Sequence, residues 1–259
     1  MEGERSENSF QEIVGESPGL KRMLALATKV ARNDAPVLIL GEPGSGKESI
    51  ARAVHRMSAR RNSSFVKVDC ATTADAMLAS ELFGLEEGAE GKSGKVGHLE
   101  LANKGILFLD EIAHMPLVLQ SKLVRLLERR KFERQGSTTS IQVNVRLIAA
   151  TRYHLGERVA EQLFRGDLYD QLKAFPIWVP ALRERRDDIP LLARHFVQTF
   201  ARRMNKHIES IPAETMSVLM NSDWPGNVRQ LENLIERSVN LTEGPTLQVP
   251  LAGGSRNPT

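Results

Sequence analysis

The sequence has 259 residues, of which 41% are hydrophobic and 26% are charged, a composition that excludes wholesale disorder. Its length predicts one large domain, or a large domain with a small one. The net charge is only +3, which excludes a polybasic binder but leaves open a local basic patch. The single cysteine, Cys70, cannot form an internal disulfide, and no run of 18 apolar residues is present. We therefore expect a cytoplasmic protein that does not span or bind a membrane.

Short apolar runs alternate with amphipathic stretches over the first 182 residues. Helical periodicity is clearest at 19–31, 48–59 and 117–130. Apolar runs typical of strands lie at 37–40, 65–68, 106–109 and 145–150, and a fifth at 174–177 contains a proline that suits an edge strand. The alternation predicts an α/β fold, with a parallel sheet sandwiched by helices.

The pattern changes at a charge run, residues 183–188, after which no strand-like run follows. Three helical patterns remain, at about 190–204, 212–221 and 227–241, and the last has Asn227 in the place of an N-cap. We therefore predict an α/β domain over 10–182 and a small all-helical domain over 183–248. The ends, 1–9 and 249–259, are expected to be flexible.

A phosphate-binding loop of the form G-x4-G-K directly follows the first predicted strand and directly precedes a helix. Such a loop wraps phosphates with backbone N–H groups, while its lysine reaches the β- and γ-phosphates. The residue after the lysine is a glutamate instead of the usual Ser or Thr, so a direct hydroxyl ligand for Mg²⁺ is missing. The alternative, a chance glycine-rich turn, is disfavoured by the strand and helix around it. The loop residues are Gly41, Glu42, Pro43, Gly44, Ser45, Gly46, Lys47 and Glu48.

Two carboxylates, Asp110 and Glu111, end the predicted strand 106–109. In a phosphate-loop enzyme the first of such a pair holds Mg²⁺ and the second polarises the attacking water. The alternative is a strand that ends in a solvated acidic turn. The phosphate loop about 65 residues earlier favours the catalytic interpretation.

Taken together, these motifs resemble the central AAA+ ATPase domain of bacterial enhancer-binding proteins, the activators of sigma-54 RNA polymerase. The resemblance runs from about Phe10 to Leu247. It is carried by 13–18 (IVGESP), 41–48 (GEPGSGKE), 80–84 (SELFG), 107–112 (LFLDEI), 132–134 (FER), 146–151 (RLIAAT), 164–169 (FRGDLY) and 224–229 (WPGNVR). It implies a phosphate-loop AAA+ sheet with a helical lid, ATP and Mg²⁺ as ligands, ATP hydrolysis, and a ring oligomer, a hexamer, that binds ATP between subunits.

The resemblance also implies roles for single residues. Ile13 and Val14 match the adenine-side contacts, Arg165 an arginine finger that reaches the neighbouring subunit, and Arg229 the sensor arginine of the lid. From the residues alone, both arginines are better explained as solvated, or as paired with carboxylates such as Asp167 and Glu232.

Several positions depart from the family pattern. The family's sigma-54-contacting loop reads GAFTGA, whereas residues 88–95 read GAEGKSGK, which argues against ordinary sigma-54 remodelling. Asp69 replaces an asparagine that holds the catalytic glutamate, Arg152 replaces a sensor asparagine, and Gln171 replaces a second finger arginine. An aspartate beside Glu111 adds like-charge repulsion unless one of them is protonated. We expect weakened hydrolysis with nucleotide binding retained.

The leading interpretation is an ATP-binding and ATP-hydrolysing module of a bacterial transcription regulator that acts with RNA polymerase holoenzyme. The alternative is a nucleotide-sensing assembly module, for ATP or a cyclic dinucleotide, with little turnover and no sigma-54 contact. In either case we expect any DNA address to come from a segment or partner outside this chain.

A cluster of cations lies on and just after the predicted helix 117–130. A solvated helix face with positive charge near its C-terminus is the expected explanation, and a nucleic-acid contact is the alternative. The six histidines show no metal-ligand spacing, so no zinc site is expected. The cluster consists of Lys122, Arg125, Arg129, Arg130, Lys131 and Arg134.

Overall fold

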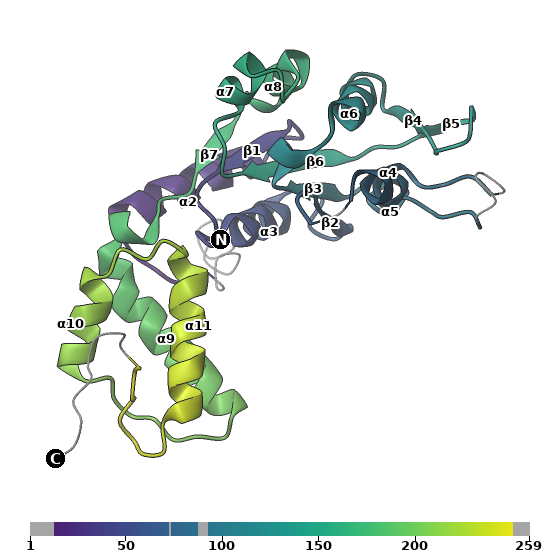
Figure 1. Cartoon of the computed structure of the whole chain (residues 1–259). Helices are drawn as coiled ribbons and strands as arrows, with labels where there is room; N and C mark the ends of the chain where they lie inside the picture. The colour runs from purple at the N-terminus through teal and green to yellow at the C-terminus, as the bar shows by residue number, and fades with distance from the viewer. Residues whose placement is uncertain (1–12, 73, 88–92, 251–259) are drawn as a thin grey trace. The chain divides into compact units, whose positions relative to one another are not determined.

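The computed structural model describes residues 13–72, 74–87 and 93–250 (Figure 1). The chain forms two compact units, which we describe one at a time. Of the described residues, the first unit contains Ile13, Arg22–Glu42 and most of Lys47–Val179. The second contains Val14–Lys21, Pro43–Gly46 and residues 180–250. No helix among the described residues is long and apolar enough to cross a membrane.

The first unit is built on a parallel five-stranded sheet with the strand order β2-β3-β6-β1-β7. Side chains of the central strands are almost all buried, as expected for a parallel sheet covered on both faces. The short β7 begins with a proline and pairs only with β1 at the edge, which confirms that prediction. The strands are β1 (Val37–Leu40), β2 (Phe65–Asp69), β3 (Ile106–Asp110), β6 (Arg146–Thr151) and β7 (Pro176–Trp178).

Helices cover both faces of this sheet. Leucines of β1, β3 and β6 pack in one cluster with side chains from α4 to α8, and Figure 1 shows α3 on the side of the sheet opposite α6. The predicted helices at 19–31, 48–59 and 117–130 are confirmed to within two residues, whereas the shorter ones were not predicted. The helical elements are α2 (Pro18–Ala31), α3 (Lys47–Met57), α4 (Asp75–Phe83), α5 (His98–Leu101), η2 (Ile112–His114), α6 (Leu117–Arg129), α7 (Leu155–Ala160) and α8 (Gly166–Leu172).

A small antiparallel hairpin follows α6, formed by β4 (Lys131–Glu133) and β5 (Ser140–Gln142). Its turn is bonded to the base of the loop that joins α4 to α5. Glu86 N–H donates to Gln135 O at 2.9 Å, and Gln135 N–H donates to the carbonyl before Leu85, that of Gly84, at 3.1 Å. Leu85 and Lys95 close the loop base with bonds of 2.8 and 2.9 Å. The residues 88–92 that depart most from the family loop lie outside the described part of the chain.

The second unit contains α9 (Ile189–Arg203), α10 (Ala213–Asn221) and α11 (Asn227–Leu241), preceded by the 3-10 turns η3 (Leu182–Glu184) and η4 (Arg186–Asp188). The three predicted helices are thus confirmed. The prediction of Asn227 as an N-cap is wrong, because Gly226 occupies that position and no side chain caps the start of α11. Asn227 is instead fully buried, for a reason that lies in the phosphate loop.

Candidate functional site

In the first unit, the strands β1, β3 and β6 end side by side at one edge of the sheet. Gly41 follows β1 and donates its N–H to Thr151 O, at the end of β6, at 3.3 Å. Asp110 ends β3 and Glu111 comes next. Because parallel strands align their carboxyl ends, sequence motifs about 65 residues apart meet here, at the edge where α/β sheets bind ligands.

Lys47, the first residue of α3, is held at this edge and is only 7% exposed. Its Nζ donates to Gly41 O at 2.9 Å and to Glu42 O at 3.3 Å, and lies 3.1 Å from Glu111 Oε1. The structure therefore brings together the predicted phosphate-binding lysine and the predicted catalytic glutamate. These three contacts, all from the protein itself, hold the ammonium group of Lys47 beside the phosphate loop.

The backbone of Glu111 is in the left-handed region, with φ of 49°. A non-glycine residue in this conformation costs on the order of 1–3 kcal/mol, and such residues concentrate at active sites. Its second carboxylate oxygen, Oε2, accepts the backbone N–H of Arg152 at 3.3 Å. Lys47 and Arg152 therefore fix both oxygens of a carboxylate that projects from a strained turn.

Lys67, on β2, joins the other two carboxylates of this edge. Its Nζ lies 2.7 Å from Glu48 Oε2 and 3.3 Å from Asp110 Oδ2. Burial opposes the charge on this lysine, but the hydrogen bond to Glu48 and the charge of Asp110 outweigh it and raise the pKa of Lys67. Burial likewise opposes the charged form of Glu48, and hydrogen bonds from Lys67 and Arg52 outweigh it and lower the pKa of Glu48. A lysine inside an apolar strand was the signal in the sequence that went unused.

The donor set at this edge suits Mg²⁺ better than a transition metal. Within the described residues, no three His, Cys, Asp or Glu side chains form a ready-made metal cage. Mg²⁺ rarely needs one, since it uses one or two carboxylates together with phosphate oxygens and waters. The carboxylates of Asp110 and Glu48 both contact the ammonium of Lys67, so they lie close together. Glu48 stands where a phosphate loop usually has the Ser or Thr hydroxyl that binds Mg²⁺, so two carboxylates are available in its place. These residues fit Mg²⁺ held jointly with phosphates.

Two positions that depart from the family pattern have defined contacts. One carboxylate oxygen of Asp69 accepts the N–H groups of Ala71 at 2.9 Å and Thr72 at 3.3 Å, which shapes the turn after β2. The guanidinium of Arg152 donates to the hydroxyl of Tyr153 at 2.7 Å and lies 4.8 Å from the centre of its ring. Arg152 thus turns its side chain to the tyrosine and only its N–H to Glu111.

In the second unit, the tip of the phosphate loop packs on the turn that begins α11. Gly44 and Gly46 both have positive φ, 71° and 105°, which brings successive N–H groups together in the kind of nest that binds anions. A Cβ on Gly44 would overlap the carbonyl oxygen of Gly226, so only glycine allows this approach. Arg229 N–H donates to Gly44 O at 3.3 Å, while its side chain is exposed and unpaired within the described residues. The predicted alternative partner, Glu232, does not bind it.

Two buried side chains that the sequence did not single out hold this loop tip. Asn227 donates through Nδ2 to Pro43 O at 3.1 Å and accepts the N–H of Leu182 at 2.7 Å. Arg185 donates through Nη2 to Ser45 O at 2.9 Å, and burial lowers the pKa of this arginine. Arg185 lies in the charge run that marks the predicted domain boundary, so part of that run is buried and structural.

The predicted adenine-side segment is fixed in the same unit by Asp188, the last residue of η4. Its carboxylate accepts the N–H groups of Glu16 at 2.6 Å and Ser17 at 2.8 Å, and the Ser17 hydroxyl at 2.7 Å. Val14 packs against the core of this unit, and Ile13 is half-buried in the first. An acidic residue directly before a helix was the available signal.

Comparison with known families matches residues 13–178 to the sigma-54 interaction domain and residues 183–251 to the AAA+ ATPase lid domain. The chain belongs to the sigma-54 interaction domain family. The match confirms the resemblance inferred from the motifs and the α/β AAA+ fold with a helical lid.

This sigma-54 interaction domain has relatives among transcription regulators. It is 52% identical over 247 residues to the formate hydrogenlyase transcriptional activator FhlA of Escherichia coli (strain K12), which covers 95% of the chain and 36% of the relative. It is 45% identical over 246 residues to a Nif-specific regulatory protein of Bradyrhizobium diazoefficiens, which covers 94% of the chain and 42% of the relative. The solved structure of NtrX from Brucella abortus in complex with ATP is 39% identical, with a TM-score of 0.86. The match covers 94% of this chain and 54% of the NtrX chain. The chain thus spans about a third to a half of these relatives.

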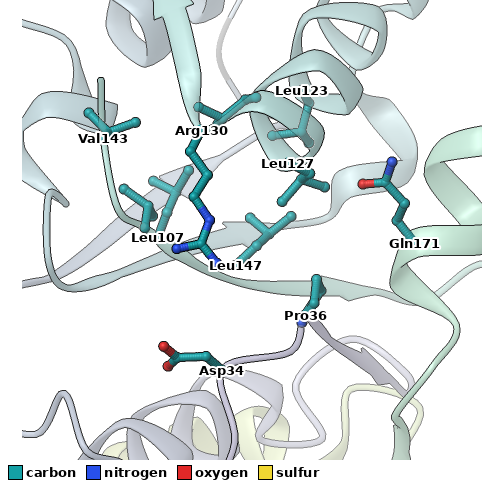
Figure 2. Close-up of a pocket in the computed structure, with 11 residues that line it drawn as sticks. Asp34, Pro36, Leu107, Leu123, Leu127, Arg130, Val143, Leu147 and Gln171 are labelled. Atoms are coloured by element: carbon teal, nitrogen blue, oxygen red, sulfur yellow. The ribbon is translucent and has the colours of Figure 1, made fainter. Parts of the chain in front are cut away.

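The two finger-like positions of this sigma-54 interaction domain, Arg165 and Gln171, contact other parts of the first unit. The exposed guanidinium of Arg165 makes two bonds to Asp167, of 3.0 and 2.7 Å, and one to Ser121 at 3.1 Å. Gln171, on α8, lines a pocket of about 260 Å³ with leucines of α6 (Figure 2). This pocket also contains Leu107 and Leu147, near the amino ends of β3 and β6, whereas the loop is at the carboxyl ends.

Proposed function

We propose that this domain binds ATP with Mg²⁺ at the carboxyl edge of its sheet and hydrolyses it as a subunit of a ring oligomer, a hexamer. The observation that carries the proposal is the buried Lys47, which the carbonyls of Gly41 and Glu42 aim at Glu111. The relative NtrX, solved with ATP, supports the same ligand for this chain.

The geometry of the loop residues supports the following proposed roles. The N–H groups around Gly44 and Gly46 bind the phosphates, and the ammonium of Lys47 stabilises the charge on the β- and γ-phosphates. Asp110, with Glu48 beside it, holds Mg²⁺, which when bound neutralises charge on the transferred phosphoryl group. Ile13 and Val14 contact the adenine, and Arg229 contacts the phosphates.

Glu111 is the residue that orients the attacking water. Phosphate oxygens compete with this carboxylate for Lys47, so binding of ATP weakens the 3.1 Å ion pair and frees Oε1 to accept a hydrogen bond from water. The backbone N–H of Arg152 keeps Oε2 in place meanwhile. Arg165 acts across the subunit boundary, where it must exchange its bonds to Asp167 for the neighbour's γ-phosphate.

The regulator that contains this domain is proposed to act on RNA polymerase holoenzyme. The family is named for its sigma-54 interaction, but residues 88–95 carry charged and small side chains in place of the aromatic tip. We therefore propose that contact with sigma-54 is weakened, and that a segment or partner outside this chain recognises the DNA sequence.

A second candidate function is nucleotide sensing with little turnover. It is favoured by the contacts of the Glu111 carboxylate. One of its oxygens pairs with Lys47 and the other accepts the N–H of Arg152, so neither is free to orient a water molecule. Asp69, in the place of the family asparagine, directs one oxygen to its own turn. In this case bound nucleotide sets the assembly state and is released largely unchanged.

One experiment separates the two candidates. Purified chain is given ATP and Mg²⁺ and turnover is followed by phosphate release, and sigma-54 is then added with ADP and a transition-state mimic of phosphate. Steady turnover with capture of sigma-54 supports the remodelling function. Binding without turnover or capture supports sensing. The Glu111→Gln variant must lose turnover and keep binding, while Lys21→Ala, an exposed lysine outside the site, must match the parent chain.

A further inference from the structure

A second polar hollow of about 330 Å³ lies in the first unit, between α6 and the β4–β5 hairpin. We call it the basic groove. Helix α6 supplies one wall and the hairpin the other, and Phe83 of α4 also lines it. Its lining is Phe83, Lys122, Arg125, Arg129, Lys131, Phe132, Glu133, Arg134, Gln135, Gly136, Ser137 and Ser140.

Most cations of the basic groove lack an acidic partner. Among the residues that the structure describes, Arg125, Arg129 and Lys131 make no ion pair or side-chain hydrogen bond, and Lys122 Nζ lies 5.2 Å from the centre of the Phe83 ring. Arg134, by contrast, is neutralised through two bonds to Glu100 of 2.9 and 2.8 Å.

The positive charge of the chain is concentrated at this place. Residues 122–134 contain six Lys and Arg and two Glu, an excess of four, which is larger than the net +3 of the whole chain. Attraction to the helix dipole accounts for a cation in the last turn of α6, such as Arg129, and not for Lys122 about two turns earlier or Lys131 on the hairpin. Unpaired like charges gathered around one groove repel one another, and a bound anion would relieve that repulsion.

The groove's other groups suit phosphate better than a protein side chain. The hairpin side carries one carboxylate, that of Glu133, and otherwise serine hydroxyls, a glutamine amide and a glycine backbone, which are common partners of phosphate oxygens. The rings of Phe83 and Phe132 are 0% and 6% exposed, so no aromatic face is available to stack an unpaired base or to pack an apolar side chain.

Lys122, Arg125 and Arg129 form a row on α6. At a rise of about 1.5 Å per residue, this row extends roughly 10 Å. Duplex DNA carries one negative charge per about 1.7 Å of its axis, so several phosphates lie within reach in any register. An acidic peptide meets the row only where its sequence happens to match the spacing. We propose that the basic groove binds the phosphodiester backbone of double-stranded DNA without sequence preference, independently of the nucleotide site.

The test is the salt dependence of DNA binding. Fluorescence anisotropy of a labelled 20-base-pair duplex of arbitrary sequence is measured with the whole chain between 50 and 200 mM salt. Four phosphate contacts predict a slope of log K against log salt near about −3.6, which is an affinity loss of about 150-fold over this range. The double variant Arg125→Gln, Arg129→Gln is expected to lower the slope to about −1.8, or an affinity loss of about 12-fold.

A matched double variant carries the same charge change elsewhere. Arg22→Gln with Arg202→Gln removes two exposed arginines, one of them in the last turn of α9, and is expected to keep the parent slope. Nucleotide binding must be unchanged in both double variants, so this proposal and the proposed function fail separately. The single variant Lys131→Gln tests the hairpin wall, with an expected slope decrease of about 0.9.

Three results would overturn the proposal. The first is an unchanged slope for the Arg125, Arg129 double variant. The second is tighter binding of single-stranded dT20 than of the duplex, since this requires stacking surfaces that the groove does not have. The third is a polyglutamate peptide that binds as tightly as the duplex and loses affinity in the same variants, which would assign the groove to an acidic protein.

Discussion

Asn227→Ala is expected to weaken both the second unit and the nucleotide site, because one buried amide serves both. Its Oδ1 accepts the N–H of Leu182 at 2.7 Å and its Nδ2 donates to Pro43 O at 3.1 Å. Its own φ is 53°, a conformation that asparagine tolerates better than alanine.

The magnitude follows from three contributions. Leaving the fully buried Leu182 N–H without a partner costs about 1–3 kcal/mol. The bond to Pro43 contributes about 0.5–1.5 kcal/mol, since this residue is exposed and water can replace the donor. Alanine at positive φ adds roughly 1 kcal/mol. The free energy of unfolding should therefore fall by about 3–5 kcal/mol, a large part of the 5–15 kcal/mol typical of a domain.

Three variants separate these contributions. Asn227→Gly relieves the backbone cost and should be about 1 kcal/mol more stable than Asn227→Ala. Asn227→Asp keeps the acceptor for Leu182 and loses the donor for Pro43, so it should lose nucleotide affinity out of proportion to its stability. Urea unfolding is followed by fluorescence of Trp224, which is buried in this unit, because Trp178 is already 59% exposed in the folded chain. Binding is followed with a fluorescent ATP analogue.

The reasoning is refuted if Asn227→Ala unfolds within 1 kcal/mol of the parent chain. It is refuted equally if Asn227→Asp binds nucleotide as tightly as the parent does, because the bond to the loop would then have no role in binding.

Other predictions concern single features of the two units. Gly44→Ala should be more destabilising than Gly46→Ala by about 1–3 kcal/mol in urea unfolding, since both have positive φ but a Cβ on Gly46 meets nothing within 4 Å; equal losses would contradict the close packing of Gly44. Burial first, and then the neighbouring carboxylates, raise the pKa of the Cys70 thiol, so a disulfide reagent at pH 8 should react with it slowly until urea unfolds the chain. The hydrogen bond from Arg134 lowers the pKa of Glu100. The pair therefore stabilises the fold above the unfolded pKa of about 4.3, and its contribution is lost as the pH falls through the lower folded value. Glu100→Gln should therefore be slightly less stable than the parent at pH 7, since solvent screens this pair, and thermal unfolding should show the gap narrowing as the pH falls through the lowered pKa of Glu100.

The central strands and the phosphate loop were predictable because their signals are local. Four consecutive apolar residues before Gly41, or an apolar run that ends in Asp110 and Glu111, indicate both the strand and the proposed chemistry within a few positions. The order of the strands makes those motifs adjacent, and the parallel arrangement follows from the alternation with helices.

What the sequence did not reveal depends on contacts between distant residues. Asn227 bonds to a carbonyl 184 residues away and Arg185 to one 140 residues away, so no local pattern distinguishes these side chains from solvated ones. The helices α5 and α7, of four and six residues, are too short to show helical periodicity, and the hairpin strands have three residues each. The N-cap prediction for Asn227 failed for a related reason. Asparagine suits an N-cap, but it also suits a buried turn with positive φ, and the sequence does not distinguish the two.

The central claim is that Lys47 binds phosphate at the carboxyl edge of the sheet, and calorimetric titration of ATP and Mg²⁺ into the parent chain and Lys47→Ala tests it most directly. Loss of a charge-assisted contact of about 2–3 kcal/mol predicts roughly 30–150-fold weaker binding by the variant. Equal affinities for the two proteins would contradict the assignment of the site.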